Sequence, residues 1–282
     1  MNPVWTIARL TFREAIRRRV VAAALVMGIL FLLIYALGFS LIQKEVSTSA
    51  ELSGGVLELR EMRNFLLLAG LYVVNFLTVM MTVLTSVDTL SGEVATGTIH
   101  SLLAKPVRRW EVVVGKWLGF AGMLTLYLLL MAGGVMATVY VLSGFIAANA
   151  LQGLSMMWLN ILLLLSVSLW GGTRFSTLTN GVLVFGLYGI AFVAGWIEQI
   201  GSIFNNQAAI NIGIVSSLLL PSEALWKGAA AAMESALVRA SGFSPFSSSP
   251  TATPSPLMIG YAVLYTAFML WLAVRYFQAR DV

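Results

Sequence analysis

Residues 17–42 read RRRVVAAALVMGILFLLIYALGFSLI, in which three arginines precede a long run without a charged side chain. A helix needs about 20 apolar residues to cross the roughly 30 Å hydrocarbon core of a bilayer. The run from Val20 to Ile42 is therefore long enough to span a membrane. It is too long for the apolar region of a signal peptide, and no convincing small-residue cleavage site follows it. We predict a retained transmembrane helix here.

Five further apolar runs follow the first one along the chain. They cover about 64–87, 112–142, 154–170, 177–197 and 257–274. The tight turn at Gly171–Arg174 makes the fourth and fifth runs an antiparallel helix pair. Charged residues make up 10% of the sequence, whereas soluble domains carry about 25%. We therefore predict an all-α integral membrane protein with six transmembrane helices, forming one membrane domain over residues 1–282.

Two segments outside these runs have helical patterns of their own. In residues 1–19, Trp5, Ala8, Phe12, Ala15 and Ile16 share one helical face, which predicts an amphipathic helix; a plain flank of the first span is the alternative.

The region 198–256 is predicted to lie outside the membrane, with re-entrant or interfacial helices. Pro221-Ser222-Glu223 has the pattern of a helix start. The helix that follows places Leu225, Ala229, Met233 and Leu237 on one face, with Lys227, Glu234 and Arg239 off it. This pattern fits a helix at a membrane interface, and equally a short helix packed on the rest of the protein.

The distribution of basic residues predicts the orientation in the membrane, because Lys and Arg are retained on the cytoplasmic side. With the N-terminus inside, twelve of the 17 basic residues fall on the cytoplasmic side and five outside. We therefore predict that both termini are cytoplasmic. The net charge of +5 comes from residues at the ends of apolar runs, which argues against nucleic acid as a partner.

The composition also limits the possible chemistry. Cysteine is absent and His100 is the only histidine, which excludes disulfides, cysteine zinc sites and iron–sulfur clusters. His100 beside Ser101 has no supporting carboxylate or nucleophile. The chain also lacks the Gly-x-x-x-x-Gly-Lys-Ser/Thr phosphate loop. We predict no catalytic, cofactor-binding or metal site in this chain.

Some polar residues and glycines within the predicted spans leave two interpretations open. Asn75, Thr78, Thr82, Thr85 and Asn180 either line a substrate path or join helices by hydrogen bonds. The pair Gly115 and Gly119 permits close helix packing, within the subunit rather than across a dimer.

The connection between the second and third spans, residues 88–116, reads DTLSGEVATGTIHSLLAKPVRRWEVVVGK. It is too polar to cross a membrane. A short helix from Thr98 to Lys105 would place Ile99, Leu102 and Leu103 on one side, and Pro106 would stop it before a second helix begins near Arg108. Such a segment is a surface that a cytoplasmic partner can bind; a merely solvated loop is the alternative.

This connection resembles the intracellular signature of ABC-2 type permeases, the membrane subunits of type V-like ATP-binding cassette exporters. The similarity rests on Ser91-Gly92-Glu93, Gly97-Thr98, Leu102-Leu103, Lys105-Pro106-Val107-Arg108-Arg109 and Gly115-Lys116, in that order and spacing. Residues 1–19 resemble the amphipathic connecting helix of that family. The six-span layout and the large last external segment also agree, so the resemblance covers essentially the whole chain.

The resemblance implies a permease subunit that is not an enzyme by itself. ATP and Mg²⁺ would be bound by two copies of a separate ATPase subunit, and a second permease subunit, the same chain, would complete the exporter in a bacterial or archaeal plasma membrane. The residues implied to couple the permease to the ATPase lie in the second connection: Glu93, Gly97, Thr98, Leu102, Leu103, Pro106, Arg108 and Arg109.

Two other functions are the alternatives to this one. An ion-coupled secondary transporter places carboxylates near the middle of the bilayer, and none of the twelve acidic residues convincingly occupies such a position in the sequence. A membrane enzyme or assembly scaffold needs a reactive cluster or a large soluble platform. The sequence has neither, and it therefore favours the exporter permease.

Overall fold

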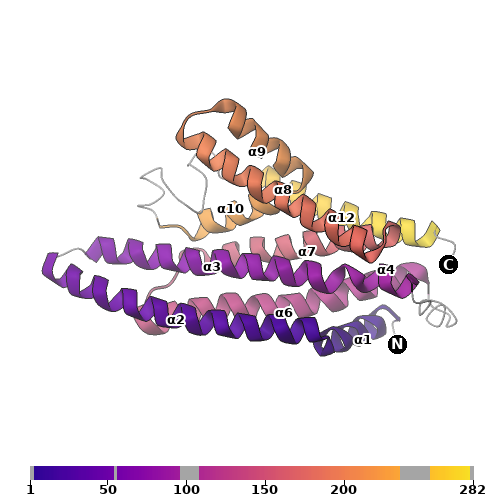
Figure 1. Ribbon diagram of the computed structural model, residues 1–282, viewed down its shortest axis with the longest axis horizontal. Helices are drawn as coiled ribbons and strands as arrows, with labels where there is room; N and C mark the ends of the chain where they lie inside the picture. Colours follow the sequence, from indigo (N-terminus) through magenta and orange to yellow (C-terminus); the bar gives the residue numbers. More distant parts are fainter. Residues whose placement is uncertain (1–2, 54–55, 96–107, 236–254, 280–282) are drawn as a thin grey trace.

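The computed structural model describes residues 3–53, 56–95, 108–235 and 255–279, and every regular element in these ranges is an α-helix (Figure 1). The helices are α1 (Pro3–Arg17), α2 (Arg19–Ser53), α3 (Val56–Ser86), α4 (Asp88–Ala95), α6 (Arg109–Ser143), α7 (Ala150–Arg174), α8 (Thr177–Ile203), α9 (Gln207–Leu219), α10 (Ser222–Met233) and α12 (Pro256–Ala279). The prediction of an all-α protein is confirmed for the described residues.

Six helices are long and apolar enough to cross a membrane, which confirms the predicted number of spans. They are α2, α3 with α4, α6, α7, α8 and α12. Several helices run past the predicted ends of the apolar runs. The second span continues to Gly92, since Val87 N donates to Val83 O at 3.0 Å across the turn between α3 and α4. A helix satisfies its own backbone in water as well as in lipid, so polarity alone does not end it.

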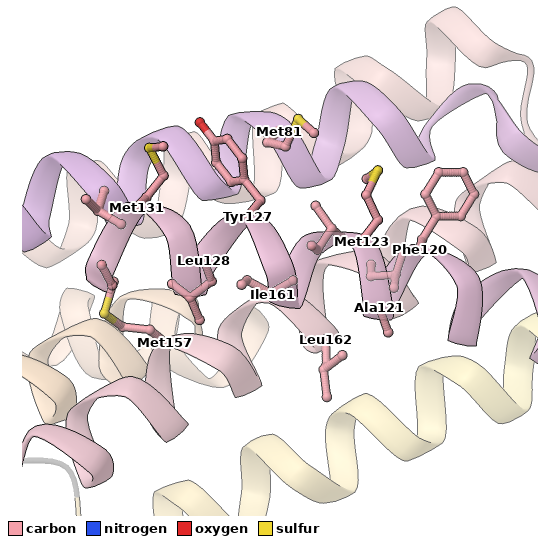
Figure 2. Close-up of a cluster of buried hydrophobic side chains, with 14 of the residues drawn as sticks. Met81, Phe120, Ala121, Met123, Tyr127, Leu128, Met131, Met157, Ile161 and Leu162 are labelled. Carbon is pink, nitrogen blue, oxygen red and sulfur yellow. The ribbon is translucent and has the colours of Figure 1, made fainter. Parts of the chain in front are cut away.

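The centre of the bundle is formed by α3, α6 and α7. In the most apolar 18-residue stretch of the α3 span and of α7, 61% of the residues are buried, whereas in the corresponding stretches of α2 and α12 the share is 11% and 17%. Figure 2 shows side chains from the three central helices in one cluster, with Met81 on α3, Tyr127 and Leu128 on α6, and Met157 and Ile161 on α7. Both chain termini lie at the same end of this bundle as α4 (Figure 1).

Helix α1 packs against the first half of α6, and glycines on α6 permit the close approach. A Cβ added at Gly119 would lie 2.7 Å from Ala8 O, and one at Gly115 would lie 2.8 Å from the Ile7 Cβ. The Gly115/Gly119 pair is therefore used within the subunit, as predicted. The expected face of α1 is partly wrong.

The buried residues of α1 are Ile7, Ala8, Thr11 and Ala15. Trp5 and Ile16 were expected on the same face as Ala8 and Ala15, yet they are 68% and 46% exposed. Ile7, Ala8 and Thr11 pack against Gly115 and Gly119, so the helix is rotated from the predicted face; Trp5 and Ile16 point outward, while Phe12 stays partly buried beside Gly122 of α6.

Helices α9 and α10 form a bent pair with an angle of 107° between them. The prediction that α10 lies at an interface with its charges outward is wrong, because Lys227 and Glu234 are buried. Lys227 Nζ forms an ion pair with Glu198 Oε2 of α8 at 2.8 Å and donates to Gly195 O at 3.3 Å. The alternative, a short helix packed on the rest of the protein, is the observed arrangement; Leu237 and Arg239 lie outside the described residues.

Candidate functional site

The junction between α3 and α4 is held to the α7–α8 hairpin by a buried asparagine. Asn180 on α8 is completely buried. Its Nδ2 donates to Val87 O at 3.1 Å and to Ser168 O on α7 at 2.9 Å. One amide thus joins three helices at the point where the second span ends. The two bonds from Nδ2 fix the relative positions of the three helices at this point, although the buried Oδ1 of the same amide has no hydrogen-bond partner among the described residues.

Hydroxyl groups continue this network along α4. Ser86 Oγ donates to Ser168 Oγ at 2.8 Å, the Ser91 and Thr177 hydroxyls are 2.8 Å apart, and Thr177 Oγ1 donates to Asp88 Oδ1 at 3.3 Å. The end of α7 is close enough for this only because residue 171 is glycine, since a Cβ there would lie 2.1 Å from Asn180 Oδ1. We refer to Ser86, Ser91, Ser168, Thr177 and Asn180 as the junction network.

Helix α6 is tied to the same region by a buried lysine and a tryptophan. Lys116 is buried, and its Nζ donates to Thr89 O on α4 at 3.2 Å. Trp117 Nε1 donates to Ser166 Oγ on α7 at 2.9 Å. The first turns of α6 are therefore fixed to both α4 and α7.

The start of α6 also contacts the end of the last span. Arg108 N donates to Glu111 Oε2 at 2.7 Å, which satisfies one of the free backbone N–H groups at the helix start. The Arg109 guanidinium donates from Nη1 to Gln278 O at 3.2 Å. A cation at the C-terminal end of α12 is also favoured by the helix dipole. Arg109 thus links the start of α6 to the end of α12.

The bend between α1 and α2 contacts the same end of the bundle through Arg18. Its Nη1 donates to Thr85 O at 3.4 Å, its Nη2 pairs with Glu14 Oε1 at 3.0 Å, and the guanidinium lies 5.9 Å from the centre of the Phe120 ring. Arg18 therefore joins α1 and α2 to the end of α3 and to α6.

The predicted coupling residues divide into three groups. Glu93 lies on α4, and Arg108 and Arg109 lie at the start of α6, where Arg108 is exposed. The others lie outside the described residues: Gly97, Thr98, Leu102, Leu103 and Pro106. The second helix of the connection begins at Arg109, where the sequence predicted it, and it is the start of α6 itself.

Asp88 at the start of α4 and Arg174 at the end of α7 have separate partners. The Arg174 guanidinium lies 4.4 Å from the centre of the Tyr276 ring, and Asp88 accepts a hydrogen bond from Thr177.

The polar residues within the spans make two kinds of hydrogen bond, between helices for the asparagines and within α3 for the threonines. Asn160 Nδ2 donates to Asn75 Oδ1 at 3.3 Å, and the hydroxyls of Thr78 and Thr82 donate to backbone carbonyls one turn earlier. All of these side chains are buried. The helix-joining interpretation is therefore observed for Asn75 and Asn180, whereas the hydroxyls of Thr78, Thr82 and Thr85 bond within their own helix. The described residues contain no group of three or more side chains suited to hold a metal ion.

Comparison with known protein families decides the identity of this fold. The family model described as "ABC-2 family transporter protein" matches residues 5–282. The chain belongs to the ABC-2 family of transporter proteins. No curated protein matches the sequence. The match covers nearly the whole chain, including the connection 88–116 and both ends of the bundle.

An ABC-2 protein is the permease of an ABC transporter, so this chain is a multi-pass membrane transport component that works with an ABC ATPase subunit. The junction network of the ABC-2 permease was missed by sequence reasoning. Asn180 was noted only as a polar residue in a span. The available signal was Gly171-Gly172 before the turn into the helix that carries Asn180, since small residues permit close helix approach.

Proposed function

We propose that this permease belongs to an exporter in which ATP hydrolysis on separate ATPase subunits drives substrate outward across the plasma membrane. Two permease copies and two ATPase copies form the working unit, and the ATPases hold ATP and Mg²⁺. The end of the bundle that carries both termini and α4 faces the cytoplasm.

The observation that supports this proposal is how residues 96–107 are attached. They connect α4 to α6, and both helices are fixed to the ends of other spans: α4 by Asn180 to α7 and α8, and α6 by Arg109 to α12. A partner's motion can bias the spans only through an element that contacts both. A slack loop would absorb that motion, whereas a segment carried on two anchored helices transmits it.

Charge is also available at both ends of the proposed docking segment. Glu93 lies on the last turns of α4, and the exposed Arg108 precedes α6. By the family resemblance, Glu93, Gly97, Thr98, Leu102 and Leu103 bind in the ATPase groove. Pro106 then stops the short helix, and Arg108 and Arg109 lie beside the groove.

The proposal is tested with a tagged permease purified together with its ATPase. We expect Glu93→Ala, and separately Gly97→Leu, to reduce ATPase recovery or to separate ATP turnover from transport, with normal membrane insertion. The matched control is Glu45→Ala, which removes the same charge at the opposite end of the bundle. Both docking variants retaining wild-type ATPase recovery and wild-type coupling would show that this segment does not dock the ATPase.

A further inference from the structure

A basic pocket lies at the bend between α1 and α2. It has a volume of about 570 Å³ and is lined by Leu10, Arg13, Glu14, Arg17 and Arg18. Three of these five side chains are arginines, and the single carboxylate leaves the pocket with a net positive charge. Neither the junction network nor the docking of residues 96–107 uses this pocket.

The arginines of the pocket differ in what they bind. Arg18 is engaged with Glu14 and with Thr85 O. Arg13 and Arg17 have no hydrogen bond or ion pair with any residue that the structure describes, and Arg17 is exposed. The one carboxylate is therefore taken up by Arg18, and two guanidinium groups remain to bind an anion. Arginine binds phosphate through two parallel hydrogen bonds, so this pair suits a phosphate group.

The surroundings of the pocket are those of a membrane surface. The first span begins at Arg19, directly after the pocket, and Val20 is 41% exposed at its start. Leu10 on the pocket wall and Trp5 on the same helix are also exposed. Exposed tryptophan and arginine at the end of a span are typical of the region where headgroups meet acyl chains.

We propose that this pocket binds the phosphate headgroup of an anionic phospholipid in the leaflet that borders α1. Arg13 and Arg17 contact the phosphate, Glu14 holds Arg18 in place, and the acyl chains lie along the exposed side of α2. A lipid fits better than a protein partner because the surface next to the pocket is the apolar first span. In the most apolar 18-residue stretch of α2, only 11% of the residues are buried. The bound lipid would anchor α1 against α6, and this inference holds whether or not the ATPase docks at residues 96–107.

The test uses the purified full-length chain and native mass spectrometry, with phosphatidylglycerol and phosphatidylcholine of identical acyl chains as probes. Wild-type protein should bind phosphatidylglycerol more tightly. A basic residue near an anionic membrane surface contributes about 1 kcal/mol, which is about fivefold in affinity. We expect Arg13→Gln and Arg17→Gln each to weaken phosphatidylglycerol binding by about fivefold, and the double variant by about 25-fold. Phosphatidylcholine binding should fall by less, because the choline cation offsets the charge of its phosphate.

Two further variants separate a local site from general surface charge. Arg275→Gln removes an exposed arginine that lies over the Trp271 ring on α12, and it should leave phosphatidylglycerol binding unchanged. Glu14→Gln should tighten binding severalfold, because it releases Arg18 and raises the charge of the pocket. This variant tests the site even if Arg13→Gln/Arg17→Gln does not fold.

Several results would overturn the assignment. The first is a loss of phosphatidylglycerol binding in Arg275→Gln as large as in Arg13→Gln or Arg17→Gln. The second is phosphatidylglycerol binding in Glu14→Gln that is no tighter than in the wild type. The third is displacement of phosphatidylglycerol by an equal concentration of inorganic phosphate. A double arginine variant that binds lipid normally but no longer co-purifies with the ATPase would instead assign the pocket to the ATPase.

Discussion

Replacing Asn180 with alanine removes the side chain that joins α4 to the α7–α8 hairpin. The substitution deletes the hydrogen bonds to Val87 O and Ser168 O, which are 3.1 and 2.9 Å long, at a completely buried position. Only the bond to Val87 O crosses between α4 and the hairpin, because Ser168 lies on α7 within the hairpin, and one hydrogen bond contributes a net stability of about 1 kcal/mol. Since 1.4 kcal/mol is a factor of ten, local separation of α4 from the hairpin should become about fivefold more frequent.

Hydrogen–deuterium exchange of the α4 amides measures this opening directly, because exchange of protected amides requires local separation or unfolding. In the Asn180→Ala variant, residues 88–95 should exchange about fivefold faster than in the wild type. In complex with its ATPase, the same variant should still allow ATP hydrolysis, but the spans should move less for each ATP hydrolysed. The reason is that a loosened α4 no longer carries α7 and α8 with it.

The matched control is Asn75→Ala, which also removes a buried span asparagine and its hydrogen bond to Asn160. Asn75 lies twelve residues before Val87 on the same helix, or about 18 Å at 1.5 Å per residue. Exchange in α4 should therefore stay at the wild-type rate in this variant. Unchanged α4 exchange in Asn180→Ala, or an equal increase in Asn75→Ala, would refute the assignment of a local clamp.

Two further variants test the packing that positions the site and the outer half of the bundle. Gly171→Ala should destabilise the protein by about 1–3 kcal/mol, because the new methyl group would lie 2.1 Å from Asn180 Oδ1; Gly186→Ala, with no atom within 4 Å, should be neutral or slightly stabilising in the same thermal unfolding assay. Lys227→Met leaves Glu198 buried without its partner and should cost about 3–5 kcal/mol. The double variant Lys227→Met/Glu198→Met should recover most of that loss, and a double variant as unstable as the single one would contradict the ion-pair argument.

The sequence predicted the six spans because each one needs a long apolar run, and such runs are visible without any tertiary information. It predicted a helix start near Arg108 as well, from Pro106, but as a helix of the connection separate from the third span, whereas the two are the single helix α6. The face of α1 could not be predicted in the same way. Both flanks of that helix are apolar, and the choice between them depends on the glycines of α6, which lie about 100 residues away in the chain.

The burial of α10 could not be predicted from the sequence pattern either. Lys227 reads as a surface charge on a short amphipathic helix, and Glu198 reads as the polar end of the fifth span. Only their 2.8 Å contact, across 29 residues of chain, shows that each allows the other to be buried. For the candidate site, the residues of the connection were recognisable from their order. The junction network was not, because its serine, threonine and asparagine side chains resemble ordinary helix-joining groups in any span.

The distribution of burial and hydrogen bonds indicates which helices respond together to a force on residues 96–107. Moving α3 and α4 away from α7 and α8 breaks the Asn180–Val87 O bond, the Ser86–Ser168 bond and the bond between the Ser91 and Thr177 hydroxyls, at about 1 kcal/mol each. Moving α2 disturbs far less packing, because 11% of the residues in its most apolar stretch are buried, against 61% in α3 and in α7. Helices α3, α4, α7 and α8 should therefore move as one body. Relative motion then concentrates at α2, where Arg18 is the polar link between the first span and the end of α3.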